Sequence, residues 1–463
     1  MNYHIIVLAA GEGTRMQTNL PKVLQPLAGK SLIDHVLNTA SQISQKISVV
    51  VGYEKELLID HLSLNHNTVM TVFQAQQIGT ADAVKTGMPN SNQDDMVLVL
   101  YGDVPLIQAS TILDGIDDQH DAFIFTMELN DPTGYGRVIK DTDDFATCII
   151  EEKDASDQEK KINEVFTGIL VMRSNTLNEL LALVDNKNAA KEYYLTDVIK
   201  IGYENNVKIK PISIDPNEVV GANTKAELEQ LETIYRDMKA KDLLEMGITL
   251  SDVSRVDVRG EVSAGKDCSI DINAIFEGKV TLGNNVSIGP NVLLKDVEIG
   301  DNSKIEAFSH IVSTSIGSNC NIGPYARLRE GTTIKNDARV GNFVETKKTT
   351  LGQGSKASHL AYLGDADIGE ETNIGAGTIT CNYDGKNKNT TKVGKKSFIG
   401  TNSSLVAPVE IGDNAYVGAG SVITKNVEDD ALAIARGKQV NKPGWSKSKK
   451  SVSYTHLTLP KKA

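Results

Sequence analysis

The sequence predicts an α/β chain built in three parts: a Rossmann-like domain, a linker helix and a parallel β-helix. Three observations support this prediction. In the first half, short apolar runs alternate with segments whose apolar residues have helical spacing. In the second half, an aliphatic residue recurs at every sixth position, and a charged stretch with helical spacing lies between the halves. At 463 residues the chain is too long for one ordinary core, so two or three domains are expected.

The first half predicts a mainly parallel sheet. The continuous apolar run 5–10 is typical of a strand buried on both faces. Apolar residues at helical spacing follow at 33–40, and the segments 49–51, 69–73 and 97–100 predict further short strands. Strands that alternate with helices form parallel sheets covered on both faces, and ligands bind beyond the carboxyl ends of such strands.

A charged segment at 226–246 predicts the linker helix. Thr224 and Glu227 have the spacing of a capping box, and Gly247 is a suitable residue for ending the helix. The expected division of the chain is therefore a first domain at 1–225, the linker helix, a second domain at 247–445 and a tail at 446–463. Within the tail, residues 452–461 resemble the translation of a sequencing-library adapter and are left out of the fold prediction.

The second half has a six-residue period. Aliphatic residues stand six apart from Leu282 to Leu294, from Ile316 to Val340 and from Val393 to Ile423, and glycine often follows them, as at Gly289. One inward aliphatic residue per hexapeptide, followed by a small residue that permits a tight corner, is the signature of a parallel β-helix with about nine or ten coils of roughly 18 residues. The period breaks at 381–391, a polar segment that we expect to project as a loop.

Composition excludes several classes of protein. Asp plus Glu number 60 against 48 Lys plus Arg, a net charge of −12, and so acidic a chain is poorly suited to general nucleic-acid binding. No run of about 18 apolar residues occurs, so no transmembrane helix is expected. The four cysteines form no CxxC pair, which argues against a zinc site and against a disulfide framework. We therefore expect a cytoplasmic protein without nucleic-acid or membrane partners.

The turn after the first predicted strand carries a candidate phosphate-binding loop. Gly11 and Gly13 let backbone N–H groups approach a phosphate chain closely, and Arg15 and Lys22 can neutralise its charge. Without these cations, a plain strand–helix turn would be the simpler interpretation. The pattern resembles the sugar-nucleotide pyrophosphorylases, which make a nucleoside-diphosphate sugar from a nucleoside triphosphate and a sugar 1-phosphate.

Further motifs narrow the resemblance to one family. They stand in the order Gln74, Gly79-Thr80, Tyr101-Gly102-Asp103, the segment 132–137, Glu151 and Asn223, before the hexapeptide repeats. With this combination, residues 3–445 resemble the bacterial bifunctional N-acetylglucosamine-1-phosphate uridyltransferase/glucosamine-1-phosphate acetyltransferases. The resemblance implies a left-handed β-helix, a homotrimer formed through it, and synthesis of UDP-N-acetylglucosamine from acetyl-CoA, glucosamine 1-phosphate and UTP.

For the first domain, the resemblance implies a nucleotide–sugar site with Mg²⁺. Gln74, Gly79 and Thr80 would read the uracil, and Asp103 and Asn223 would hold the ion, since a hard cation prefers oxygen ligands. The two cations of the loop would stabilise phosphate charge while the sugar phosphate oxygen attacks the α-phosphorus of UTP and pyrophosphate leaves. The residues expected to bind UDP-N-acetylglucosamine are Leu8, Ala9, Ala10, Gly11, Lys22, Gln74, Gly79, Thr80, Tyr101, Gly102, Asp103, Gly136, Glu151 and Asn223.

For the second domain, the resemblance implies an acetyltransferase site around His359. A lone histidine is more often structural, but Arg329, Lys347 and Lys388 lie in the same part of the sequence and match the family's phosphate-binding groups. His359 would be the general base that takes a proton from the glucosamine amine as it attacks the acetyl thioester. The other expected contacts of glucosamine phosphate or acetyl-CoA are Tyr362, Asn373, Ala376, Asn382, Tyr383, Thr401, Ala419 and Arg436.

The sequence departs from the family pattern at four places. Phe166 stands where the family has an Asn that contacts the sugar, and Ala190-Lys191 stand where Gln-Gly is usual. We expect the apolar ring of Phe166 to weaken sugar-phosphate binding, unless the ring points into the core and a neighbour serves the sugar. In the second domain, Ser358 replaces a glycine, and Thr401 replaces a serine while keeping the hydroxyl.

Two other functions are compatible with parts of the sequence. The β-helix could serve only for trimerisation beside a single pyrophosphorylase activity, which the polar loop and the cluster around His359 disfavour. The chain could also be a regulatory sensor that only binds nucleotide, which the presence of Asp103, Lys22 and Arg15 disfavours. Taken alone, Asp103 could cap a helix and Glu151 could be a surface carboxylate.

Overall fold

The computed structural model describes residues 1–448, apart from 12–15, 17, 53–54, 89–90 and 189. The adapter-like segment 452–461 therefore lies outside the described residues. Contacts within the fold divide the chain into two compact units: the first comprises 1–264 and 269–280, and the second comprises 265–268 and 281 onward. The first unit thus takes in the expected linker helix and the first strands that follow it.

The first unit is built on nine strands, which are β1 (Tyr3–Ala9), β4 (Ile47–Val51), β5 (Met70–Phe73), β6 (Met96–Tyr101), β7 (Ala122–Glu128), β8 (Arg137–Lys140), β9 (Ala146–Ile150), β10 (Glu164–Arg173) and β11 (Lys210–Ser213). Their order is β11-β7-β10-β6-β1-β4-β5, with the β8–β9 hairpin beside β10. Strands β1, β4, β5 and β6 are parallel, as predicted. Strand β10 runs antiparallel to both β6 and β7, so the sheet is mixed, which the alternating pattern did not predict.

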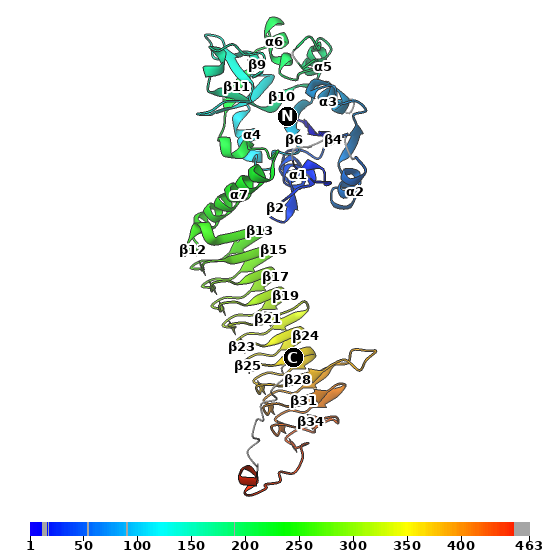
Figure 1. Ribbon diagram of the computed structural model, residues 1–463, viewed down its shortest axis with the longest axis vertical. Coiled ribbons are helices and arrows are strands. Elements are labelled where there is room, and N and C mark those ends of the chain that lie inside the picture. Colours follow the sequence, from blue (N-terminus) through cyan, green and yellow to red (C-terminus); the bar gives the residue numbers. More distant parts are fainter. Residues whose placement is uncertain (12–15, 17, 53–54, 89–90, 189, 449–463) are drawn as a thin grey trace, which may run out of the picture. The chain divides into compact units, whose positions relative to one another are not determined.

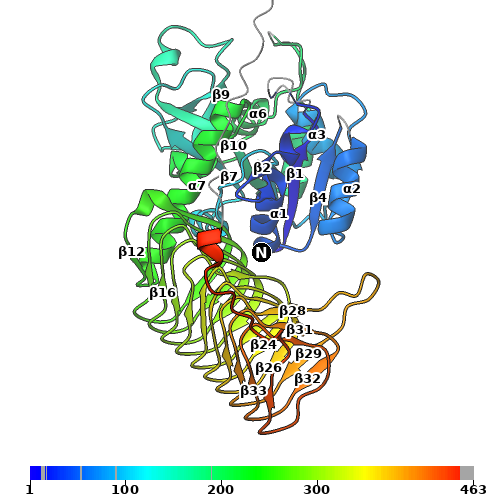
Figure 2. The same cartoon turned by 60° about the horizontal axis from the view of Figure 1, so that its bottom comes forward.

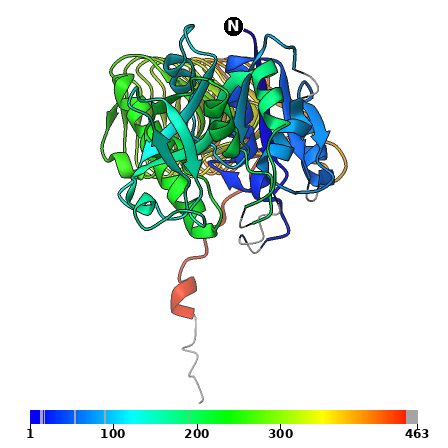
Figure 3. The same cartoon turned by 90° about the horizontal axis from the view of Figure 1, so that it is seen from above.

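Helices cover both faces of this sheet, which Figure 3 shows with its blue and cyan strands. Helices α1 (Leu32–Ile43), α2 (Lys55–Asn65) and α4 (Ala109–Gly115) share one core with Ile5 and Val7. Helices α3 (Thr80–Gly87), α5 (Ser174–Leu181) and α6 (Asp197–Glu204) share the other core with Ile6 and Leu8. Because successive side chains of a strand point to opposite faces, the continuous apolar run of β1 supplies both cores. A short hairpin, β2 (Pro26–Leu27) and β3 (Lys30–Ser31), precedes α1.

The expected linker helix is α7 (Lys225–Glu245), and Gly247 follows it with φ +84°. The Thr224 hydroxyl accepts a hydrogen bond from the Glu227 N–H at 3.2 Å, as expected of an N-cap. The reciprocal half of the predicted capping box is absent among these described residues, because the Glu227 carboxylate accepts from the Asn223 N–H instead. Leu228 of α7 packs in a core with α1. The start of α7 thus fixes the backbone at Asn223.

Short parallel strands stack along the rest of the chain (Figure 1). The first are β12 (Thr249–Leu250), β13 (Val256–Ala264), β14 (Ser269–Ile270) and β15 (Ala274–Leu282). The others are β16 (Ser287–Ile288), β17 (Leu293–Ile299), β18 (Lys304–Ile305), β19 (His310–Ile316), β20 (Asn321–Ile322), β21 (Arg327–Leu328), β22 (Thr332–Ile334), β23 (Arg339–Asn342), β24 (Glu345–Leu351), β25 (Lys356–His359), β26 (Tyr362–Ile368), β27 (Asn373–Ile374), β28 (Ile379–Cys381), β29 (Thr391–Val393), β30 (Phe398–Ile399), β31 (Ser404–Val406), β32 (Val409–Ile411), β33 (Tyr416–Val417), β34 (Val422–Ile423) and β35 (Leu432–Ala433).

The second unit is a left-handed parallel β-helix, as predicted. One of its sheets has the order β16-β18-β20-β23-β25-β27-β30-β33-β35, and another has the order β17-β19-β21-β24-β26-β28-β31-β34. The aliphatic residues of the six-residue repeat form the interior of the β-helix. Every predicted aliphatic position from Ile316 to Val340 and from Val393 to Ile423 is at most 4% exposed. The hexapeptide period therefore predicted the core of this unit position by position.

Most glycines that follow the inward aliphatic residues have a different role from the predicted one, although Gly323 has a left-handed backbone with φ +101°. A Cβ atom on Gly341 would lie 2.0 Å from the Ser358 carbonyl oxygen, and one on Gly289 would lie 3.0 Å from the Ala307 nitrogen. These glycines permit close approach of the next coil. The left-handed backbone at the turns is supplied by other residues, such as Asn302 with φ +59°.

The predicted loop projects between β28 and β29, where Figure 2 shows it leaving the coils. Tyr383 and Lys388 pair across it as an isolated antiparallel bridge. Among the helices that the structure describes, none combines the length and apolar character needed to cross a bilayer.

Candidate active sites

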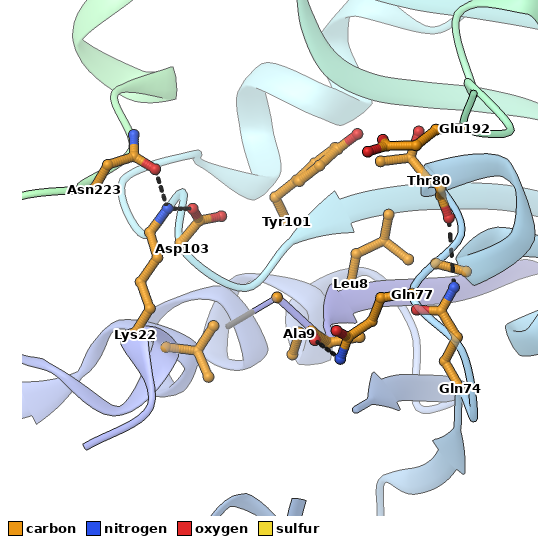
Figure 4. Close-up of a pocket in the computed structure, with 15 residues that line it drawn as sticks. Leu8, Ala9, Lys22, Gln74, Gln77, Thr80, Tyr101, Asp103, Glu192 and Asn223 are labelled. Carbon is orange, nitrogen blue, oxygen red and sulfur yellow. Dashed lines mark hydrogen bonds and ion pairs between the residues drawn. The ribbon is translucent and has the colours of Figure 1, made fainter. Parts of the chain in front are cut away.

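A cavity of about 420 Å³ lies at the carboxyl ends of β1 and β6 in the first unit (Figure 4). Eleven predicted residues line it: Leu8, Ala9, Ala10, Gly11, Lys22, Gln74, Gly79, Thr80, Tyr101, Asp103 and Asn223. This position is where parallel α/β sheets bind ligands. Arg15 and Gly13 lie outside the described residues.

Four lining residues were not predicted from the sequence: Val23, Gln77, Ala83 and Glu192. The Gln77 side chain donates a hydrogen bond to the Ala10 carbonyl at 2.8 Å, so it ties the end of β1 to the segment before α3. The position of Gln77 in the sequence, between the predicted residues Gln74 and Gly79, could have indicated that it lines the cavity. Glu192 immediately follows the unusual pair Ala190-Lys191 in the sequence.

One end of the cavity is built around the start of α3. The Gln74 side chain is 4% exposed and donates to Asp82 Oδ2 at 2.8 Å. Gly79 has φ +138°, and a Cβ atom there would lie 2.3 Å from the Tyr193 carbonyl oxygen, so only glycine fits. Thr80 Oγ1 accepts from the Leu195 N–H at 3.0 Å. These contacts hold the three residues expected to read the uracil at one end of the site.

The other end of the cavity gathers charge. The Lys22 ammonium forms an ion pair with Asp103 Oδ2 and donates to Asn223 Oδ1 at 2.7 Å (Figure 4). Because one ammonium contacts both side chains, the two oxygens converge on a single cationic position. Two oxygen donors arranged in this way fit a hard divalent cation.

Tyr101 lies between the two ends of the cavity in Figure 4. Burial raises the pKa of its hydroxyl far above the ordinary value of 10, and the charges of Asp103 and Glu151 raise this pKa further. The hydroxyl therefore stays protonated at neutral pH and can donate a hydrogen bond.

Gly102, Gly136 and Glu151 do not line the cavity, although the sequence predicted them as ligand-binding residues. Gly136 accepts a hydrogen bond from the Phe166 N–H at 2.9 Å, and Glu151 accepts from Thr196 Oγ1 at 3.0 Å. The Phe166 ring is 7% exposed and belongs to the core under α3, α5 and α6. The sequence left two interpretations of Phe166 open, a ring in the sugar site or a ring in the core. Its burial agrees with the second.

In the second unit, His359 ends β25 and faces Asn342 of β23 in the parallel register. Its Nδ1 lies 2.7 Å from Asn342 Oδ1. An amide oxygen can only accept, so Nδ1 carries the proton and Nε2 of the neutral ring keeps its lone pair. The sequence analysis did not predict a role for Asn342. Its position 17 residues before His359, which is about one coil of the β-helix, could have indicated that the two side chains meet.

Two predicted cations on neighbouring coils are paired with carboxylates. Arg329 Nη1 lies 2.9 Å from Glu345 Oε1, and Lys347 Nζ lies 3.0 Å from Glu330 Oε1. Tyr362, another residue predicted for this site, lies on β26 opposite Glu345 of β24 in the parallel register. Exposed pairs of this kind are weak, so an anionic ligand can compete for the cations.

The expected acetyl-CoA contacts lie on successive coils beyond His359. Ala376, Thr401 and Ala419 each follow a glycine that approaches the next coil, and a Cβ on Gly375 would lie 2.7 Å from the Thr401 nitrogen. Arg436 donates to the Ala419 carbonyl at 2.7 Å. The other expected contacts are placed as follows: Asn373 on β27, buried Asn382 with its amide on Asp365, and exposed Tyr383 in the loop. Lys388, the third cation expected to bind phosphate, is exposed in the same loop.

Comparison with known proteins covers both units. A MobA-like NTP transferase domain model matches residues 5–194, a GMPPB C-terminal domain model matches 258–350, and six bacterial transferase hexapeptide repeats match 390–425. The "Bifunctional protein GlmU" of Pseudoalteromonas atlantica is 46% identical over 97% of this chain and 100% of its own length. That of Cellvibrio japonicus is 47% identical over 96% of this chain and 98% of its own. A solved structure of UDP-glucose pyrophosphorylase with UDP-glucose has a TM-score of 0.42 at 17% identity, covering 51% of this chain and all of that one.

The fold and the repeats define a nucleotidyltransferase joined to a hexapeptide-repeat transferase. More particularly, the chain belongs to the GlmU family of bifunctional proteins. The family expected from the sequence motifs is thereby confirmed.

Proposed function

We propose that this chain carries out its family's two reactions at the two sites described above. It is a bifunctional uridylyltransferase and acetyltransferase of UDP-N-acetylglucosamine synthesis. The second unit transfers an acetyl group from acetyl-CoA to glucosamine 1-phosphate. The first unit then joins the resulting N-acetylglucosamine 1-phosphate to UTP with release of pyrophosphate. The functional boundaries we propose are 1–225 for the first activity, 226–246 for the linker and 247–445 for the second.

The observation that carries the uridylyl assignment is the convergence of Lys22, Asp103 and Asn223 in the cavity. Lys22 is held where it can bind the phosphates of UTP, and Gln74, Gly79 and Thr80 hold the uracil. The sugar phosphate oxygen attacks the α-phosphorus of UTP in line with the departing pyrophosphate. Positioning and charge neutralisation supply most of the catalysis in such a reaction.

Asp103 and Asn223 are the residues we propose to hold Mg²⁺. Their oxygens converge on the Lys22 ammonium, and a divalent ion would take its place between them, which would leave Lys22 to the phosphates. A bound Mg²⁺ supplies charge neutralisation for the phosphates. The backbone bond from Asn223 to Glu227 keeps Asn223 in position whether or not an ion is present.

The acetyl transfer is assigned to His359. With its proton on Nδ1 and held by Asn342, the ring offers Nε2 as the base for the glucosamine amine. As the amine attacks the acetyl thioester, Nε2 takes the amine proton. Arg329, Lys347 and Lys388 bind the phosphate, in exchange for their present carboxylate partners where they have them.

A homotrimer formed through the β-helix is part of this proposal. Phe308, Tyr325 and Phe343 are about half exposed and stack in a ladder, with ring centroids 4.9 and 5.3 Å apart. Leu360, which is 60% exposed, continues the ladder one coil further and adjoins His359. Exposed apolar surface of this extent is typical of an interface with another chain.

The experiment that tests the proposal is a separate assay of each half-reaction with the purified protein. Acetylation is followed from glucosamine 1-phosphate and acetyl-CoA, and uridylyl transfer from N-acetylglucosamine 1-phosphate and UTP. Both should proceed, and light scattering should give the mass of three chains. Activity in only one assay would contradict the two-site assignment.

A further inference from the structure

The first unit holds a second cluster of polar side chains, separate from the cavity. In the part of the chain that the structure describes, Asp34, His61 and His66 form a group whose potential ligand atoms all lie within 4.8 Å of one another. His61 Nε2 is 2.8 Å and His66 Nε2 is 2.7 Å from the same carboxylate oxygen, Asp34 Oδ1. None of the three lines the cavity. They play no part in the proposed reactions.

The local fold holds these side chains in place. Asp34 lies in the first turn of α1, where its Oδ2 accepts from the Ser31 N–H at 3.0 Å and completes a capping box. This bond leaves Oδ1 facing the two imidazoles. His61 lies in α2, and His66 follows the end of α2 with its N–H bonded to the Leu62 carbonyl at 2.7 Å. Since Leu62 is buried in the core beside α1, both histidines are held close to Asp34.

The chemistry of this trio suits a zinc ion. Two imidazole nitrogens and one carboxylate oxygen are a common set of three protein ligands for zinc, and a water completes the tetrahedron. The three side chains are 14–25% exposed, so an ion and its water can reach them. Ligand atoms about 2.0–2.1 Å from a tetrahedral zinc lie about 3.3 Å apart. The present separations of 2.7 and 2.8 Å need to open by only about half an ångström, which small side-chain rotations provide.

We propose that Asp34, His61 and His66 bind one zinc ion, which links the start of α1 to the end of α2. The wide spacing of the cysteines excludes only a zinc site made of cysteines, and the sequence signal for this site is two histidines five residues apart at the end of a helix. The ion has a structural role, because the trio lies outside the cavity and each ligand is anchored to a separate part of the α1–α2 pair.

The test is calorimetric titration of the metal-stripped full-length protein with Zn²⁺. The wild type should bind zinc at one high-affinity site. His66→Gln should weaken binding at this site by more than about 100-fold, since even the loss of a second-shell partner costs 10–100-fold. The glutamine amide can still donate to Asp34, so this variant keeps the hydrogen bond while removing the ligand nitrogen. His120→Gln is the matched control, because His120 likewise pairs with a carboxylate, that of Asp117 at 2.8 Å, but is not part of the cluster.

A thermal unfolding scan gives a second readout. Zinc should raise the unfolding temperature of the wild type and of His120→Gln, and should have no such effect on His66→Gln. His61→Gln should behave as His66→Gln does, which covers the case in which one variant folds poorly. If the wild type binds no zinc, or if both glutamine variants bind it as tightly as the wild type, the trio is only a hydrogen-bonded link and the proposal is wrong.

Discussion

The two candidate active sites are assembled from the chain in different ways. In the first unit, Lys22, Asp103 and Asn223 meet although up to 201 positions separate them. In the second unit, Asn342 and His359 meet because one coil of the β-helix separates them. An α/β sheet collects residues from several strand ends into a concave cavity, whereas a β-helix repeats neighbours at a fixed interval along an open face. The two activities should therefore respond independently to substitution.

The largest effect is expected for His359→Ala. Loss of a general base costs about 10²–10⁴-fold in rate, so acetylation should nearly disappear while uridylyl transfer stays unchanged. Each half-reaction is measured alone. His310→Ala, at another histidine of the β-helix, is the control and should acetylate normally. Normal acetylation by His359→Ala would remove this residue from the mechanism.

Asp103→Ala should have the next largest effect. It removes one of the two oxygens proposed to hold Mg²⁺, so uridylyl transfer should fall by about 10²–10³-fold, the usual cost of losing one electrostatic stabiliser. Acetylation should be spared, and a chelator should likewise stop only uridylyl transfer. Asp121→Ala, at an exposed carboxylate paired with Arg173, is the control. A chelator that stopped only acetylation would show that the metal is misplaced.

Asn342→Ala should have a smaller effect on acetylation. The imidazole loses the acceptor that fixes its tautomer, and the turnover number should fall by about 10–100-fold with little change in KM. Asn342→Asp keeps an acceptor oxygen and should retain most of the activity. Equal losses in the two variants would indicate that Asn342 matters for the fold and not for the proton on His359.

Phe166→Asn should have the smallest effect on either rate. Because the ring is buried in the core, its loss should lower the free energy of unfolding by about 3–5 kcal/mol, measured by urea denaturation. The KM for N-acetylglucosamine 1-phosphate should not improve. Phe166→Leu keeps the site apolar and should be less destabilising. A KM that falls several-fold in the Asn variant, with stability unchanged, would place position 166 in the sugar site after all.

Much of the second unit could be predicted because its period is local. Each inward aliphatic position is set by the six residues around it, so Val393 to Ile423 were located without any knowledge of the rest of the chain. The role of most of these glycines was misjudged, because the closeness of the next coil at Gly341 is a property of stacking, which the six-residue pattern does not contain.

Less of the first unit could be predicted from residues alone. Buried apolar runs located the parallel strands, but nothing in the pattern showed that β10 turns antiparallel between β6 and β7. The motifs located Lys22 and Asp103, yet the contacts that bring Gln77 and Glu192 to the cavity depend on tertiary packing. The cluster of Asp34, His61 and His66 went unnoticed for the same reason, because its members come from the start of α1 and from the end of α2 and the residue after it, which only the tertiary fold brings together.

The most direct test of two independent sites is a complementation assay with Asp103→Ala and His359→Ala. Each variant alone, given glucosamine 1-phosphate, acetyl-CoA and UTP, should make almost no UDP-N-acetylglucosamine. An equal mixture should make it readily, because N-acetylglucosamine 1-phosphate released by Asp103→Ala is taken up by His359→Ala. A mixture as inactive as either variant alone, with each variant folded, would contradict the assignment of one activity to each site.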